Sequence, residues 1–162
     1  MDSIQNIFYN KDYPIDQIYP VIESNQIKIS IHDGNSYALL DGKKIFLPWN
    51  VESSYNYWRG VLNEQLHDHP HCYLECDGKF IIKEGDIIAD VGAAEGFLAI
   101  QHIEKIKHAY IFEVDDTWFK MLQKTYEPYK DKVTLVKGFV GDGEENISLD
   151  KYFSDKEAPT FY

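Results

Sequence analysis

The stretch that most constrains the fold is residues 87–100, which read IIADVGAAEGFLAI. Its first five residues form a mostly apolar run, which predicts a buried β-strand. Gly92 and Gly96 predict a tight turn, and the apolar residues after Gly96 predict the start of a helix. A helix that begins directly after such a turn presents unpaired backbone N–H groups to a ligand. The stretch therefore predicts a strand–turn–helix unit with a cofactor site of the nucleotide-binding type.

A second predicted strand, residues 110–113, ends at the carboxylate of Glu113. It follows the glycine turn by roughly 20 residues, the separation expected of an acid that binds a ribose in a βαβ unit. A carboxylate only accepts hydrogen bonds, so one such group can accept from both ribose hydroxyl groups. The alternative is an ordinary strand–turn–helix corner, in which the two glycines serve only backbone geometry.

The glycine spacing distinguishes between cofactors. A dinucleotide site needs G-x-G-x-x-G, but here Ala94 stands at the middle position and Phe97 at the third. The pattern is instead D-x-G-x-x-x-G, formed by Asp90, Gly92 and Gly96. It resembles motif I of the class I S-adenosylmethionine-dependent methyltransferases, whose cofactor has no pyrophosphate. A nicotinamide-dependent oxidoreductase is the less favoured alternative.

The resemblance implies which residues contact S-adenosylmethionine. Asp90 would lie near the methionine part, Gly92 and Ala93 would allow close approach of the backbone, and Glu113 would hold the ribose. Val114 and Phe139 would be apolar neighbours of the adenosine. The complete set of expected cofactor-binding residues is Asp90, Gly92, Ala93, Gly96, Glu113, Val114 and Phe139. The resemblance assigns no catalytic base and no metal ligand in this chain.

The residues after Glu113 continue the alternation of strands and helices. Asp115 or Asp116 is suited to cap a helix that ends before Pro128, and residues 133–136 predict a third strand. The residues after Glu113 resemble the FkbM-type methyltransferases. The resemblance also includes residues 63–65, 69–74, 84–86 and 148–153. That family is associated with O-methylation of sugars and natural products, so a small-molecule hydroxyl group is the expected methyl acceptor.

The predicted fold is α/β, a Rossmann-like class I methyltransferase fold with the first three strands and the start of a fourth. The family continues beyond the position of residues 159–162, where this chain stops, so we expect a truncated chain that binds cofactor more readily than it turns over substrate. The alternative is a non-catalytic binding or assembly module. Without a fourth strand, residues 87–91 form an apolar sheet edge. We therefore expect a homo-oligomer, or cover of that edge by the N-terminal part or by residues 160–162.

The region before the cofactor unit predicts a smaller, separate part. After an aromatic and proline-containing arm at residues 1–24, residues 27–47 alternate between apolar and polar side chains around two Asp-Gly turns, which predicts an antiparallel meander. Ser53 or Ser54 is suited to cap the helix that follows. Its aromatic residues are expected in the core or, alternatively, in a lid over the acceptor. We place the domain boundary between residues 1–79 and 80–162.

Composition limits the partners. The chain has 162 residues and a formal net charge of −11, which disfavours nucleic acids and anionic membranes. Its first residues lack the pattern of a signal peptide, so the expected location is the cytoplasm.

Cys72 and Cys76 stand near His67, His69 and His71, but no second ligand pair follows at a distance. We therefore favour a structural role for these residues over a metal site.

Overall fold

The computed structural model describes residues 27–65 and 81–141. The first described part is a meander of three antiparallel strands, β1 (Ile29–His32), β2 (Asn35–Leu40) and β3 (Lys43–Leu47), in that spatial order. Two-residue Asp-Gly turns join the strands, with positive φ angles at both positions, as the tight hairpin turns require. The predicted meander is thus confirmed.

Helix α2 (Val51–Glu64) follows the meander and packs against β1 and β2. Its cap is Asn50, whose side-chain oxygen accepts a hydrogen bond from the backbone N–H of Ser53 at 2.9 Å. The prediction of Ser53 or Ser54 as the cap was wrong, because both lie inside the first turn of the helix. Asn is an equally good cap, and its earlier position adds almost a turn to the helix.

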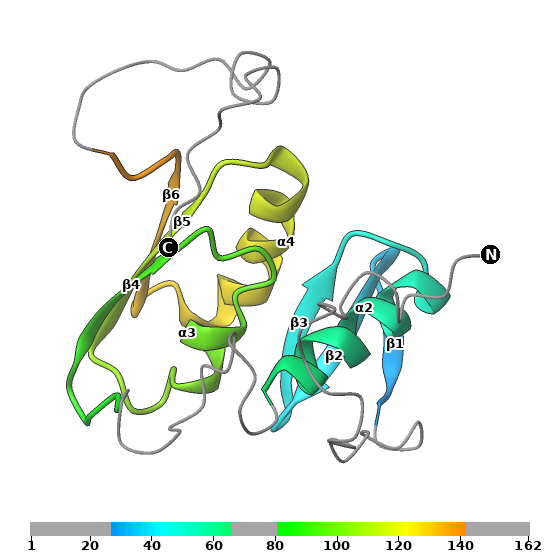
Figure 1. The fold of residues 1–162 in the computed structure, drawn as a ribbon, viewed down its shortest axis with the longest axis horizontal. Coiled ribbons are helices and arrows are strands. Elements are labelled where there is room, and N and C mark those ends of the chain that lie inside the picture. The colour runs from blue at the N-terminus through cyan, green and yellow to red at the C-terminus, as the bar shows by residue number, and fades with distance from the viewer. Residues whose placement is uncertain (1–26, 66–80, 142–162) are drawn as a thin grey trace, which may run out of the picture.

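The second described part is a parallel sheet with helices on one face (Figure 1). Its strands are, in spatial order, β4 (Ile87–Val91), β5 (His108–Glu113) and β6 (Val133–Lys137), and the helix α4 (Asp116–Tyr126) connects β5 to β6. This order is that of one half of a Rossmann-like sheet and confirms the predicted α/β fold class. Asp115 caps α4 by accepting hydrogen bonds from the N–H groups of Thr117 and Trp118, one of the two caps considered from the sequence. In chain order the elements are β4 (Ile87–Val91), α3 (Phe97–Gln101), β5 (His108–Glu113), α4 (Asp116–Tyr126), the short 3-10 helix η2 (Glu127–Tyr129) and β6 (Val133–Lys137).

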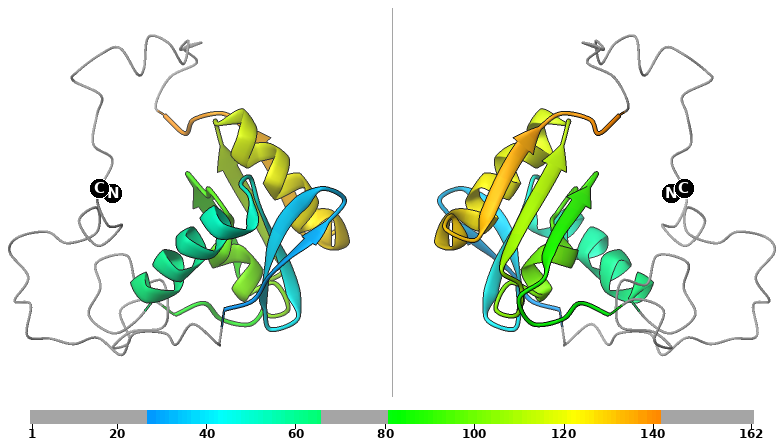
Figure 2. Two further views of the ribbon diagram at one scale, coloured as in Figure 1. Left: turned by 90° about the vertical axis from the view of Figure 1, so that its right-hand side faces the viewer. Right: turned by 90° about the vertical axis from the view of Figure 1, so that its left-hand side faces the viewer.

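The two parts share one hydrophobic core. Helix α4 packs against β3 of the meander, and the buried backbone N–H of Phe46 donates a hydrogen bond to the hydroxyl group of Thr125 at 3.0 Å. The rings of Trp58 on α2 and Phe97 on α3 lie 5.7 Å apart. The views in Figure 2 show the meander and α2 beside the helical face of the parallel sheet. The N-terminal part is therefore placed next to the turn after β4.

Several sequence predictions lie outside the described residues: the N-terminal arm, the His and Cys cluster at residues 67–76, the domain boundary at 79/80 and the start of a fourth strand. Within residues 27–65 and 81–141, no helix has both the length and the apolar character needed to cross a membrane. The same described residues contain no group of three or more His, Cys, Asp or Glu side chains arranged to hold a metal ion.

Candidate cofactor site

The turn between β4 and α3 is held to the neighbouring strand by its own backbone. Gly92 and Ala93 both donate hydrogen bonds from their N–H groups to the carbonyl oxygen of Phe112, at 2.9 and 3.1 Å. The chain then takes positive φ angles at Gly92, Ala94 and Gly96, of 71°, 46° and 76°. Two of the N–H groups that a phosphate would need are therefore already used within the protein.

Glu113 supports the same turn from the end of β5. Its carboxylate accepts hydrogen bonds from the N–H groups of Ala94 at 2.9 Å, and of Val114 and Asp115 at 2.8 Å each. The residue is only 7% exposed. A carboxylate offers about four acceptor positions, so three are filled by backbone N–H groups. The expected contact with two ribose hydroxyl groups stays a prediction, and it requires one of these three hydrogen bonds to open.

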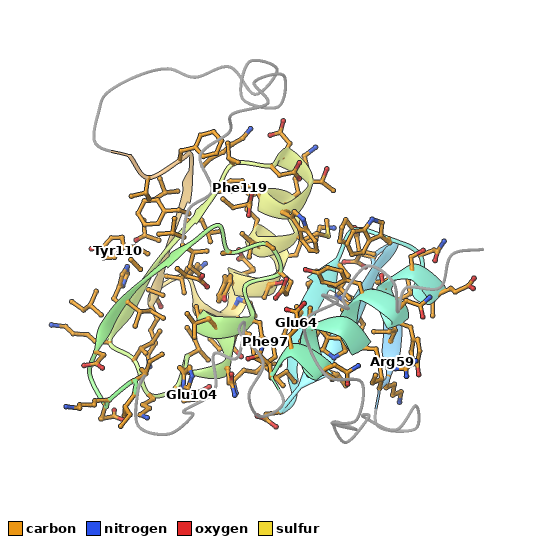
Figure 3. All side chains as sticks on the ribbon, in the orientation of Figure 1. Arg59, Glu64, Phe97, Glu104, Tyr110 and Phe119 are labelled. Carbon is orange, nitrogen blue, oxygen red and sulfur yellow. The ribbon has the colours of Figure 1, made fainter. Side chains whose placement is uncertain are left out.

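A cavity of about 370 Å³ lies between this turn and α2. Glu64 of α2 and Phe97 of α3, both labelled in Figure 3, are among the residues that line it. Gly92 is at its wall, and a Cβ atom added there would meet nothing within 4 Å. The described residues that line the cavity are Tyr57, Val61, Glu64, Gln65, Ala89, Asp90, Val91, Gly92, Ala93, Ala94, Glu95, Phe97 and Leu98. Three of them are carboxylates, and none is Lys, Arg or His.

Two of these carboxyl groups have raised pKa values. The pKa of Asp90 is raised to about 6, mainly by burial; a backbone hydrogen bond from Ala99 opposes the shift, and the nearby charge of Glu113 adds to it. The pKa of Glu95 is raised to about 7, again mainly by burial; the hydrogen bond from Tyr57 opposes the shift, and the charges of Asp90 and Glu64 add to it. One oxygen of Asp90, Oδ2, is buried and has no hydrogen-bond partner among the described residues. These features favour a ligand that brings positive charge or a hydrogen-bond donor.

The structure brings together only part of the predicted site. Asp90, Gly92 and Ala93 line the cavity, whereas Gly96 and Glu113 lie behind the turn and support it. Val114 is half-buried next to Glu113, and Phe139 is 40% exposed; neither is among the residues lining the cavity. Their roles as neighbours of adenosine therefore stay predictions.

Sequence reasoning missed Glu95 and the wall formed by α2. Tyr57, Val61, Glu64 and Gln65 follow one another at helical spacing, so they share one face of α2. The aromatic residues of this helix, Tyr57 among them, were expected in the core or in a lid over the acceptor, and the two polar residues on the same face as Tyr57 were a signal that this face borders a cavity. Glu95 was visible as the one charged residue inside the glycine turn.

The fold and the site together define a Rossmann-like α/β unit with a carboxylate-lined cavity at its first strand–turn–helix corner. No protein-family model matches the chain, and no curated protein matches it. Among solved structures, the chain is similar to wild-type Trm5b from Pyrococcus abyssi, with a TM-score of 0.40 and 12% identity over 69% of this chain and 35% of that one. It is also similar to the methyltransferase FkbM from Methylobacillus flagellatus KT, with a TM-score of 0.39 and 20% identity over 60% of this chain and 31% of that one. The similarity spans about a third of either protein.

Proposed function

We propose that this chain binds S-adenosylmethionine at the Asp90–Gly96 turn and belongs to a methyltransferase that acts on a hydroxyl group of a sugar or another small molecule. The observation that carries the proposal is the charge of the cavity, which contains Asp90, Glu95 and Glu64 and no basic side chain. S-adenosylmethionine carries a sulfonium and an ammonium group, whereas the pyrophosphate of a dinucleotide is anionic. The cavity therefore suits the first cofactor and repels the second.

The proposed cofactor supplies an activated methyl group, and the protein has to hold it in line with the acceptor oxygen. In this chain, Asp90 would accept a hydrogen bond from the ammonium group, and Gly92 would let the cofactor lie against the backbone. A deprotonated carboxylate near the sulfonium adds electrostatic attraction. We assign no catalytic base among these residues, and we expect the protein in the cytoplasm.

Calorimetric titration with S-adenosylmethionine tests the proposal. We expect binding by the wild-type protein and binding weakened roughly tenfold or more in Asp90→Asn, which removes a charge without changing size. Asp86→Asn is the matched control, because it removes the same charge just before the other end of β4. The Asp86 side chain accepts a hydrogen bond from the N–H of Lys83, and the substituted amide oxygen still accepts it. Absence of heat with S-adenosylmethionine, or binding of NADH instead, would show that the proposal is wrong.

A second candidate function, an assembly module, is favoured by the uncovered face of the parallel sheet. Among the described elements, helices cover one face only, and β4 has a sheet partner on one side only (Figure 2). Parallel sheets are normally buried on both faces. The strand register places on the uncovered face Ile87, Ala89, Val91, His108, Tyr110, Phe112, Thr134 and Val136. None of these is acidic or a Lys or Arg, although the chain as a whole has a net charge of −11.

We propose that a second copy of this chain pairs along the free edge of β4, next to this apolar face. Light scattering over a dilution series tests it, with an oligomer expected for the wild-type protein and a monomer for Ile87→Lys. Ile31→Lys is the matched control, because Ile31 is 64% exposed on the edge strand β1 and Ile87 is 59% exposed on the edge strand β4. A wild-type protein that is monomeric at every concentration contradicts this proposal.

A further inference from the structure

Tyr57 connects α2 to the cofactor turn. Its hydroxyl group donates a hydrogen bond to Oε2 of Glu95 at 2.5 Å, across 38 residues of sequence. Its ring packs against two others, with the centroid of Trp49 at 4.8 Å and that of Trp118 at 5.3 Å, and those two centroids lie 5.2 Å from each other. The tyrosine is thus held by aromatic packing on its ring, and its polar end is directed at one carboxylate.

Glu95 is a residue of the cofactor turn, so a hydrogen bond that holds its side chain also restrains the turn. It lies between Ala94 and Gly96, both of which have positive φ angles, and it is only 9% exposed. The backbone of the turn is tied to β5 through Gly92 and Ala93. The Tyr57–Glu95 hydrogen bond joins the turn to α2 through side chains.

We propose that Tyr57 is a positioning residue of the cofactor site, which holds the Glu95 carboxylate at the cavity so that α2 completes the site for a positively charged cofactor. This inference rests on the proposed binding of S-adenosylmethionine. A carboxylate already held in place costs less conformational entropy on binding than one that has to be ordered by the ligand. Helix α2, from outside the parallel-sheet unit, then becomes necessary for tight binding at the turn.

The pair also makes binding depend on pH. A cationic ligand favours the deprotonated form of Glu95, and the hydrogen bond from Tyr57 stabilises that form. The other titratable groups that interact with the pair or with the Asp90 carboxylate are Glu64 on α2, Asp90 on β4, Glu113 on β5 and Tyr126 on α4, and none of them is a base. Removing the Tyr57 hydroxyl group should therefore raise the pKa of Glu95 and move the rise in cofactor affinity to higher pH.

The test is the affinity for S-adenosylmethionine, measured by calorimetry from about pH 5.5 to about pH 8.5. Tyr57→Phe should bind roughly tenfold more weakly at neutral pH, and its midpoint should move to higher pH. Glu95→Gln should also bind more weakly and lose the part of the pH dependence that lies near neutrality. Tyr55→Phe should match the wild-type protein, because Tyr55 lies on the same helix but is not among the residues lining the cavity.

The outcomes separate this inference from the proposed function. If the wild-type protein does not bind at any pH, the proposed function is wrong. If it binds, and Tyr57→Phe keeps both the affinity and the midpoint, the inference alone is overturned, even where thermal stability falls. Should Tyr57→Phe fail to fold, Glu95→Gln decides, and an unchanged pH dependence in that variant overturns the inference.

Discussion

The two glycines of the cofactor turn have similar φ angles but different surroundings. Gly92 has a φ angle of 71° and faces open space at the cavity wall. Gly96 has a φ angle of 76°, but a Cβ atom there would lie 2.8 Å from the side chains of Leu122 and Tyr126. The Tyr126 hydroxyl group also donates a hydrogen bond to the Gly96 carbonyl oxygen at 2.5 Å. One glycine leaves room for a ligand, and the other lets α4 pack closely against the turn.

The difference shows that a glycine motif combines a binding requirement with a folding requirement. The spacing D-x-G-x-x-x-G gives no indication of which glycine serves which purpose. The alternative to cofactor binding was that both glycines serve only backbone geometry, and it describes Gly96 well. Gly92 remains the position where close approach of a ligand is expected. Substitutions at the two ends of the turn should separate these roles.

The largest effect is expected for Gly96→Ala. The substitution places a side chain in the left-handed region and forces Leu122 and the buried ring of Tyr126 to move, for a combined cost of about 3 kcal/mol. The free energy of unfolding from denaturant titration, followed by tryptophan fluorescence, measures this cost. A loss below about 1 kcal/mol would mean that α4 adjusts easily and that the contrast between the two glycines is small.

The second-largest effect is expected in how the free energy of unfolding depends on pH, because Glu95, the neighbour of Gly96, is buried. Because its pKa rises from 4.5 to about 7 on folding, the folded state holds the proton more tightly, and stability falls as the pH rises through this range. Between about pH 5 and pH 8, the wild-type protein should lose about 2–3 kcal/mol relative to Glu95→Gln.

The measurement is the difference in unfolding free energy between the wild-type protein and Glu95→Gln at each pH. Glutamine keeps an oxygen that accepts the hydrogen bond from Tyr57, so the variant changes the charge and little else. Glu64→Gln is the control, because its carboxyl group also lines the cavity but belongs to α2. A difference that does not vary with pH would contradict the raised pKa.

Local sequence signals predicted the elements of the fold well. The apolar run 87–91, the Asp-Gly turns and the acid at Asp115 each act within a few residues, so pattern and capping rules apply directly. The missed cap Asn50 was a choice between neighbouring residues with similar capping preference. In such a case the alternative structures differ by only a few residues and differ little in energy.

The site was less predictable because its contacts join residues far apart in the sequence. Tyr57 and Glu95 are 38 residues apart, and Glu113 reaches the N–H of Ala94 across 19 residues. The sequence favoured a ligand-binding role for Glu113, but a buried carboxylate also satisfies backbone groups that would otherwise lack partners. Glu113→Ala would therefore disturb the turn itself, which makes Asp90→Asn the sharper test of cofactor binding.

Gly92→Ala is expected to change stability least and to act mainly on the affinity for the cofactor. The added methyl group meets no atom within 4 Å, so the cost is the left-handed backbone alone, about 1 kcal/mol. The same methyl group would occupy space at the cavity wall, where the cofactor is expected to approach the backbone. Affinity for S-adenosylmethionine should therefore fall far more than stability does, the reverse of the balance expected for Gly96→Ala. Wild-type affinity in Gly92→Ala would move the proposed cofactor away from this glycine and leave the motif with a folding role at both ends.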